Sequence, residues 1–191
     1  RKVLPNVKIV LGGNLAASGE LLHKFCGVDV CVIGEGERVI VHLAKYYSRH
    51  LDEADHTELK KIKGITYLDA HGEMVFTGYE AAIPAEELFD PDFSILEEYS
   101  DINTFIGDPF RREDFAQDPR SYEPHRAGKK MGTVIFTKGC VARCTFCHRW
   151  DKGFRQLRPE KVIAQIRYLM SQYNVGFIQF GDENFGSDRK A

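Results

Sequence analysis

Three cysteines lie close together in this chain, and their spacing is its most informative chemical feature. Cys140, Cys144 and Cys147 form a C-x3-C-x2-C motif. Iron–sulfur clusters are usually held by four cysteine thiolates. A loop that supplies three thiolates could hold three corners of a four-iron cluster and leave the fourth iron open to an external ligand. Phe146 precedes the last cysteine, so its ring would lie beside whatever binds that iron.

Other sites can be built from the same cysteines and the neighbouring His148. Cys144, Cys147 and His148 fit the C-x-x-C-H pattern of c-type haem attachment, but this pattern leaves Cys140 unused and needs an exported protein. A structural zinc ion could bind the three cysteines and His148, although His148 directly follows Cys147 and no second cysteine pair lies at zinc-finger distance. A redox pair of Cys144 and Cys147 would not need the third cysteine, and unliganded thiols would leave the clustering unexplained.

The segments on either side of the motif predict a parallel β-α-β unit. Residues 133–137 are β-branched and aromatic, as in a strand, and Lys138–Gly139 is expected to end that strand before Cys140. Pro159 suits the first turn of a helix with an apolar face, and residues 177–180 predict a second strand. Ligands of such units bind beyond the carboxyl ends of the strands. The cysteine loop is therefore expected at the mouth of the sheet.

Two acidic residues, Asp182 and Glu183, follow the second predicted strand. They would face the same mouth as the cysteine loop. A carboxylate in that place could accept charge-assisted hydrogen bonds from an ammonium group. The alternative is a solvated acidic turn, and the spacing leaves open which of the two residues would make the contact.

The N-terminal segment predicts two further parallel strands that end in glycine-rich turns. We expect strands over residues 7–11 and 28–33 and helices over 18–25 and 37–51. Because glycine lets the backbone approach a bulky ligand closely, these turns could line a binding groove, although ordinary β-α turns are the alternative. The candidate groove residues are Gly12, Gly13, Gly34, Glu35 and Gly36.

Several other residues carry structural expectations only. His23 is expected on the exposed side of its helix, and Cys26 and Cys31 are expected to pack as small apolar side chains. Residues 64–77 predict a β-hairpin with glycine in its loop. Residues 100–130 mix basic and acidic side chains and are expected to form a solvated loop.

Together these motifs resemble those of radical S-adenosylmethionine (SAM) enzymes that carry a cobalamin-binding domain. In that family the cysteine loop follows the first barrel strand and holds a 4Fe–4S cluster, whose open iron binds the amino and carboxylate groups of SAM. The resemblance implies that the N-terminal glycine turns line the groove for cobalamin. It also implies cluster ligation by Cys140, Cys144 and Cys147 and SAM contacts from Phe146, Asp182 and Glu183.

The resemblance also implies a reaction. The cluster reductively cleaves SAM to a 5′-deoxyadenosyl radical, and methyl transfer to an unactivated carbon is the expected outcome, with cyclisation or rearrangement as the alternative. The implied partners are a small-molecule or peptide substrate and an electron donor such as flavodoxin or ferredoxin. A protein of another class, a non-catalytic iron–sulfur or zinc-binding module, would use the same cysteines for structure alone.

The expected fold is α/β, divided into three parts. Residues 1–55 would be the C-terminal part of a Rossmann-like cobalamin-binding domain, residues 56–130 a hairpin and linker, and residues 131–191 the N-terminal part of a radical SAM barrel. The family's upstream half, with its cobalt-ligating histidine loop, has no counterpart here. We therefore expect an internal segment of a longer protein that is inactive by itself.

Composition narrows the cellular setting. A net charge of −2 and an isoelectric point near 6.4 argue against general nucleic-acid binding. No apolar run reaches the length needed to span a bilayer, so no membrane association is expected. Five cysteines, an odd number with three in one motif, predict a reducing compartment, the cytoplasm, rather than a disulfide framework.

Overall fold

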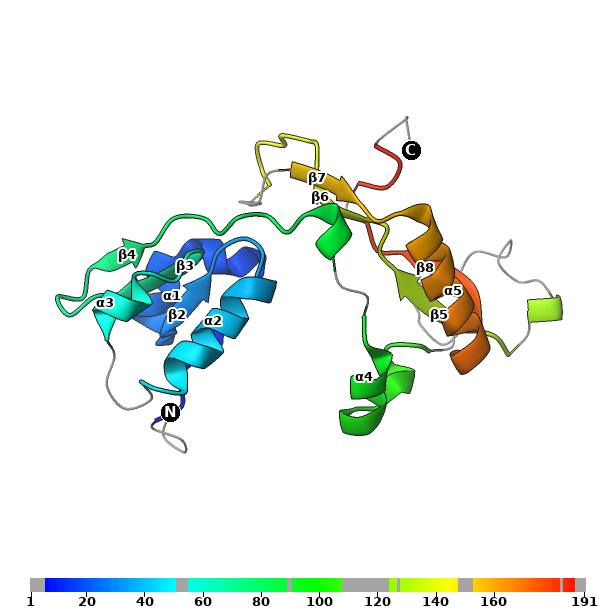
Figure 1. The fold of residues 1–191 in the computed structure, drawn as a ribbon, viewed down its shortest axis with the longest axis horizontal. Coiled ribbons are helices and arrows are strands. Elements are labelled where there is room, and N and C mark those ends of the chain that lie inside the picture. The colour runs from blue at the N-terminus through cyan, green and yellow to red at the C-terminus, as the bar shows by residue number, and fades with distance from the viewer. Residues whose placement is uncertain are drawn as a thin grey trace. The chain divides into compact units, whose positions relative to one another are not determined.

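The chain packs as two compact units in the computed structural model (Figure 1). One unit contains residues 1–83 with 142–152, and the other contains residues 84–141 with 153–191. The structure describes residues 6–50, 55–88, 91–107, 124–126, 128–147, 153–182 and 184–187. Within these ranges no helix is both long enough and apolar enough to cross a membrane.

The first unit is built on a four-stranded mixed sheet. Its elements are β1 (Val10–Leu11), a 3₁₀ turn (Asn14–Ser18), α1 (Gly19–Cys26), β2 (Val30–Val32), α2 (Glu37–Tyr47), α3 (His56–Leu59), β3 (Ile65–Leu68) and β4 (Met74–Phe76). The strand order is β1-β2-β3-β4, with β1 parallel to β2 and with β3 antiparallel to both β2 and β4. The expected hairpin is confirmed, and it extends this sheet. The domain boundaries expected at residues 55 and 130 remain predictions.

Strand β2 is the centre of this unit because both of its faces are buried. Successive side chains of a strand point to opposite faces. Val30 and Val32 pack in one hydrophobic cluster with Val39 and Leu43 of α2, whereas Cys31 belongs to a second cluster on the α1 side. Full burial of a valine or leucine side chain stabilises a fold by about 1.5–3 kcal/mol. Burial of both faces of β2 therefore stabilises the sheet that carries the two glycine turns.

His23 is buried, and the expectation that it would be exposed was wrong. Its ring contacts the carbonyl oxygen of Val28 through Nδ1 (2.9 Å) and the hydroxyl of Thr66 through Nε2 (3.0 Å). Helix α1 can approach β3 this closely because Gly19 has no side chain: an added Cβ would lie 2.7 Å from the Thr66 hydroxyl. Both ring nitrogens have partners, which is the usual condition for burying a histidine.

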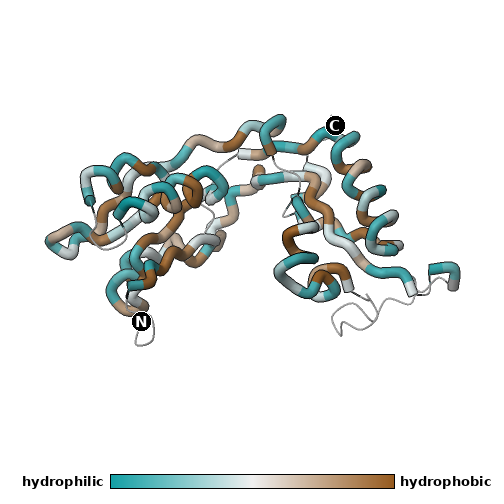
Figure 2. The backbone as a smooth tube through the Cα atoms, turned by 60° about the horizontal axis from the view of Figure 1, so that its bottom comes forward, coloured by the Kyte–Doolittle hydropathy of each residue, from teal (hydrophilic) through white to brown (hydrophobic). Residues whose placement is uncertain are grey.

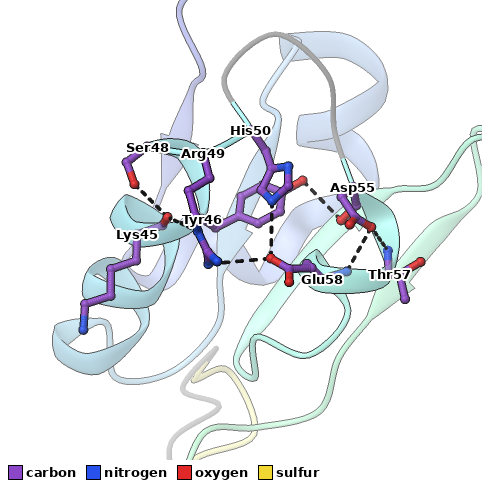
Figure 3. Close-up of polar contacts among 8 residues, drawn as sticks. All are labelled: Lys45, Tyr46, Ser48, Arg49, His50, Asp55, Thr57 and Glu58. Atoms are coloured by element: carbon purple, nitrogen blue, oxygen red, sulfur yellow. Dashed lines mark hydrogen bonds and ion pairs between the residues drawn. The ribbon is translucent and has the colours of Figure 1, made fainter.

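A polar network joins the end of α2 to the start of α3 (Figure 3). Asp55 caps α3, and hydrogen bonds from backbone amides, first of all that of Glu58, lower the pKa of its carboxyl group. The Tyr46 hydroxyl donates to the Asp55 carbonyl oxygen (3.3 Å), while His50 and Arg49 both contact the Glu58 carboxylate (3.3 and 3.6 Å). Exposed ion pairs contribute little free energy, so the main effect of the network is to connect the end of α2 with α3.

The second unit contains the predicted β-α-β motif. Its elements are α4 (Phe93–Tyr99), β5 (Lys130–Val134), β6 (Thr137–Cys140), β7 (Gly153–Gln156), α5 (Pro159–Tyr173) and β8 (Val175–Phe180), with 3₁₀ turns at Ala85–Glu87, Ile102–Thr104 and Pro124–Arg126. Strands β5 and β8 pair in parallel, as predicted, and α5 connects them. The strand expected over residues 133–137 divides into β5 and β6, and β6 pairs antiparallel with β7. That second hairpin was not predicted.

Helix α5 covers the β5–β8 pair with one apolar face. Hydrophobic and hydrophilic residues alternate along it (Figure 2), and Leu169 is fully buried against the sheet together with Val134 and Val175. Gly132 of β5 makes room for this contact, since an added Cβ would lie 3.1 Å from a methyl group of Leu169. The helix ends at Asn174, whose left-handed backbone conformation turns the chain directly into β8.

Candidate functional site

Cys140 is the last residue of β6, and strand β7 holds it in place. Cys140 pairs with Gly153 of β7, and Gly139 pairs with Phe154. Gly139 has a φ angle of +97°, and a Cβ added there would overlap the carbonyl oxygen of Gly153. Only glycine allows this backbone conformation and this close approach. Lys138 and Gly139 therefore continue the strand that presents Cys140, and the expectation that they would end a strand was wrong.

The Cys140 thiol lies beside the chain that leaves β8. The side-chain amide of Asn184 donates a hydrogen bond to the sulfur, with 3.2 Å between Nδ2 and Sγ. Asn184 is itself held by its turn, because the Ser187 hydroxyl donates to its carbonyl oxygen (2.7 Å). Asn184 was not predicted from the sequence. Its position directly after the acidic pair, at the end of a predicted strand, could have indicated that it lies near the cysteine loop.

Asp182 follows β8 and binds the start of β6. Its Oδ1 accepts hydrogen bonds from the backbone amide of Phe136 (3.0 Å) and the hydroxyl of Thr137 (2.6 Å), and also from the Thr137 backbone amide. Its Oδ2 lies 3.2 Å from the Phe136 amide. Each oxygen of the carboxylate thus has a donor within this unit. Glu183, the other acidic residue proposed for SAM, lies outside the described residues.

Cys144 and Cys147 share a tight turn. The backbone amide of Cys147 donates to the carbonyl oxygen of Cys144 (3.2 Å), and both side chains are exposed. The Phe146 side chain between them is 84% exposed, so it does not serve to pack the loop. Among the described residues no three His, Cys, Asp or Glu side chains are gathered as a metal site. His148, which the zinc and haem alternatives require, lies outside the described residues.

The donor chemistry of the motif fits an iron–sulfur cluster. Cys140, Cys144 and Cys147 form no disulfide, and neither do Cys26 and Cys31. Thiolate sulfur is the ligand that such clusters use. Cys31 is buried, and burial raises the pKa of its thiol, so it is a poor source of thiolate.

The N-terminal glycine turns lie at one edge of the first sheet. β1 and β2 are parallel neighbours, and the turns that follow them contain Gly12 and Gly13 in one case and Gly34 and Gly36 in the other. A Cβ added at Gly12, Gly13 or Gly34 would meet no atom within 4 Å, and one added at Gly36 would meet only Val32, at 3.8 Å. These positions border open space that a side chain would occupy, which fits a groove for a bulky ligand.

Glu35, between these glycines, has a structural contact as well. Its carboxylate accepts a hydrogen bond from the backbone amide of Ile83 (3.0 Å), and the Ile83 side chain is almost fully buried. The contact joins the second glycine turn to the chain that leaves the hairpin. The hairpin therefore supports the turn that follows β2.

The chain is similar in sequence to a segment of known enzymes. The anaerobic magnesium-protoporphyrin IX monomethyl ester cyclase of Cereibacter sphaeroides is 31% identical over 195 residues, which cover 99% of this chain and 28% of that protein. The chain spans less than a third of this and a second curated relative. No protein-family model matches the chain.

Two solved structures share the fold. OxsB, a cobalamin-dependent SAM radical enzyme with aqua-cobalamin bound, superposes with a TM-score of 0.62 at 24% identity over 93% of this chain and 21% of that one. TsrM of Kitasatospora setae, a radical SAM methyltransferase with cobalamin and a 4Fe–4S cluster bound, superposes with a TM-score of 0.54 at 20% identity, over 93% of this chain and 31% of that one. The expected α/β fold class is thereby confirmed.

Proposed function

We propose that this chain, which is homologous to a segment of the cobalamin-dependent radical SAM enzymes, supplies the cluster-binding loop and part of the cobalamin groove of such an enzyme. The observation that carries the proposal is the position of the C-x3-C-x2-C motif. Its first cysteine ends β6, beside the carboxyl end of the parallel β5–β8 pair. That is where α/β units bind their ligands.

Each residue of the cluster region has a role in this proposal. Cys140, Cys144 and Cys147 hold the cluster. When bound, a 4Fe–4S cluster supplies the electron that cleaves SAM to a 5′-deoxyadenosyl radical. The exposed ring of Phe146 is free to cover the adenine of SAM. Because Asp182 already binds backbone donors of β6, Glu183 is the carboxylate that accepts the methionyl ammonium.

The glycine turns of the first unit contribute the cobalamin groove. Gly12, Gly13 and Gly34 leave open space beside the ends of β1 and β2, so the backbone itself forms the groove wall. Gly36 opens α2, and Glu35 holds the turn in place through Ile83. A bulky ligand could therefore lie on backbone atoms of both turns, where any larger residue would reduce the space.

Two reaction outcomes remain candidates. Methyl transfer to an unactivated carbon of a small molecule or peptide is the outcome expected from the family resemblance, and TsrM is a methyltransferase. Ring formation is favoured by a specific observation: a relative 31% identical over nearly the whole chain is a cyclase. SAM labelled in its methyl group separates the two, because only methyl transfer would place the label in the product.

The proposed function requires an electron donor and a reducing compartment. The electron would come from a small donor protein, a flavodoxin or a ferredoxin. The reducing cytoplasm suits a chain whose five cysteines form no disulfide. A net charge of −2 gives no support for a nucleic-acid substrate.

The test is anaerobic reconstitution of the full-length protein with iron and sulfide. Alanine at Cys140, Cys144 or Cys147 should remove most of the bound iron, because two thiolates do not retain a four-iron cluster. Alanine at Cys26 or Cys31 should leave iron content unchanged, since neither belongs to the motif. Addition of SAM should change the EPR spectrum of the reduced cluster, which requires an open iron.

Three results would contradict the proposal. Equal iron loss from Cys26→Ala would show that the motif is not the ligand set. An EPR spectrum that SAM leaves unchanged would show a closed, non-catalytic cluster. Stoichiometric zinc, with no iron uptake by the reduced protein, would identify a structural zinc module.

A further inference from the structure

We propose that the side-chain amide of Asn184 raises the reduction potential of the cluster by donating a hydrogen bond to the thiolate of Cys140. The inference rests on the proposed function, since it takes Cys140 as a cluster ligand. Asn184 lies outside the cysteine motif and would act on the cluster through Cys140, one of its ligands.

The hydrogen bond joins two parts of the chain that are far apart in sequence. Asn184 Nδ2 lies 3.2 Å from Cys140 Sγ, across a separation of 44 residues, and the contact is partly buried. Both ends are fixed by other contacts. The Ser187 hydroxyl holds the turn that carries Asn184, and Asp182 binds the amides of Phe136 and Thr137 at the start of β6. These contacts hold the donor beside the sulfur.

The Asn184–Cys140 contact is partly shielded from water. Both residues are of intermediate burial, and the Phe185 ring next to Asn184 in sequence lies 4.7 Å from the Phe180 ring and 6.1 Å from the Phe136 ring, measured between centroids. A hydrogen bond counts for more where water competes less.

The direction of the effect follows from charge. Reduction adds one negative charge to a cluster, and part of that charge resides on the ligating sulfurs. A hydrogen bond to a ligand sulfur is stronger when the sulfur is more negative, so it stabilises the reduced state more than the oxidised state. Removal of the donor should make the cluster harder to reduce.

The experiment compares Asn184→Leu with a matched control, Asn103→Leu, in the full-length reconstituted protein without SAM. Asn103 is an exposed asparagine of the same unit, whose side chain meets Asp101 and Lys130. An EPR-monitored redox titration should show that Asn184→Leu lowers the ratio of reduced to oxidised cluster roughly tenfold at a fixed potential, a shift of about 59 mV for one electron. Iron content should equal that of the parent, and the control should titrate like the parent.

A potential equal to that of the parent, at normal iron content, would overturn the inference and leave the proposed function intact. If Asn184→Leu takes up no cluster, Asn184→Ala decides, because it removes the donor without adding bulk or charge beside the cluster. A lower potential in that variant supports the role, and an unchanged potential or a second loss of cluster refutes tuning by Asn184. A parent protein that forms no cluster would refute both the function and the inference.

Discussion

At the scale of single residues, the structure gives Asp182 of the acidic pair a set of contacts within its own unit. Asp182 and Glu183 were equivalent in sequence, since both follow a strand that ends at the proposed site. In the structure the Asp182 carboxylate binds the amides of Phe136 and Thr137 and the hydroxyl of Thr137. A carboxylate with these partners stabilises the start of β6, which leads directly to Cys140.

The substitutions Asp182→Asn and Glu183→Gln should therefore have different effects in the full-length protein. Asp182→Asn replaces one acceptor oxygen by a donor facing backbone amides, so thermal stability and iron content should fall, while SAM affinity of the remaining cluster stays near normal. Glu183→Gln should keep the cluster and weaken SAM binding roughly ten- to hundred-fold, the loss of a charge-assisted hydrogen bond worth about 1.5–3 kcal/mol. SAM titrations followed by EPR measure the SAM affinity, while iron analysis and thermal denaturation measure cluster content and stability. The opposite pattern would assign SAM binding to Asp182.

At the scale of elements, the unpredicted β6–β7 hairpin is what presents the first cysteine. Gly139 sits one residue before Cys140 with a φ angle of +97°, and Gly153 opposite Cys140 has a φ angle of +126°. The two glycines differ in their surroundings. A Cβ on Gly139 would overlap the Gly153 carbonyl, whereas a Cβ on Gly153 would meet no atom within 4 Å.

This difference provides a matched pair of variants. Gly153→Ala should show only the backbone strain of a left-handed residue, about 1–2 kcal/mol of stability. Gly139→Ala adds the overlap with the facing strand, so it should be destabilised more and should lose iron as β6 moves. Chemical denaturation and iron content after reconstitution measure these effects. Equal behaviour of the two variants would mean that the close approach of β6 and β7 does not position Cys140.

At the scale of the whole molecule, the cysteine motif is divided between the two packing units. Cys140 belongs to the unit of the β5–β8 pair, whereas Cys144 and Cys147 belong with the glycine turns to the unit of residues 1–83 and 142–152. The glycine turns and the cysteines are nevertheless different residues. Changes in the glycine turns should therefore affect cobalamin and leave the cluster ligands in place.

Gly36→Ala is the sharpest test of the groove. Gly36 has a φ angle of −89°, which any residue adopts, and its added methyl would meet only Val32 at 3.8 Å. The variant should fold normally, while overpacking of about 1–3 kcal/mol against a bound ligand should weaken cobalamin binding several-fold to about a hundredfold. Cobalamin content is read by absorbance, with Gly27→Ala, which adds strain at a helix end away from the groove, as the control. Normal cobalamin content in Gly36→Ala would show that these glycine turns do not line the cobalamin groove.

The chain's local features were determined by its sequence. Three structural features follow from residue types within short windows. They are the β3–β4 hairpin, the helix from Pro159 to Tyr173 with its cap at Asn174, and the parallel β-α-β unit. These features depend on backbone preference and apolar periodicity, which act between near neighbours. They were sufficient to indicate the fold class and the place of the candidate site.

The partners of individual polar side chains were decided by the tertiary structure. His23 with Thr66, Asp182 with Phe136 and Asn184 with Cys140 are pairs separated by 43, 46 and 44 residues. Such pairs depend on how helices pack on sheets and where strands end, and no short window contains both members. The sequence therefore predicted which residues could bind a cluster, and only the tertiary structure showed that Asp182 contacts Thr137 and that Asn184 contacts Cys140.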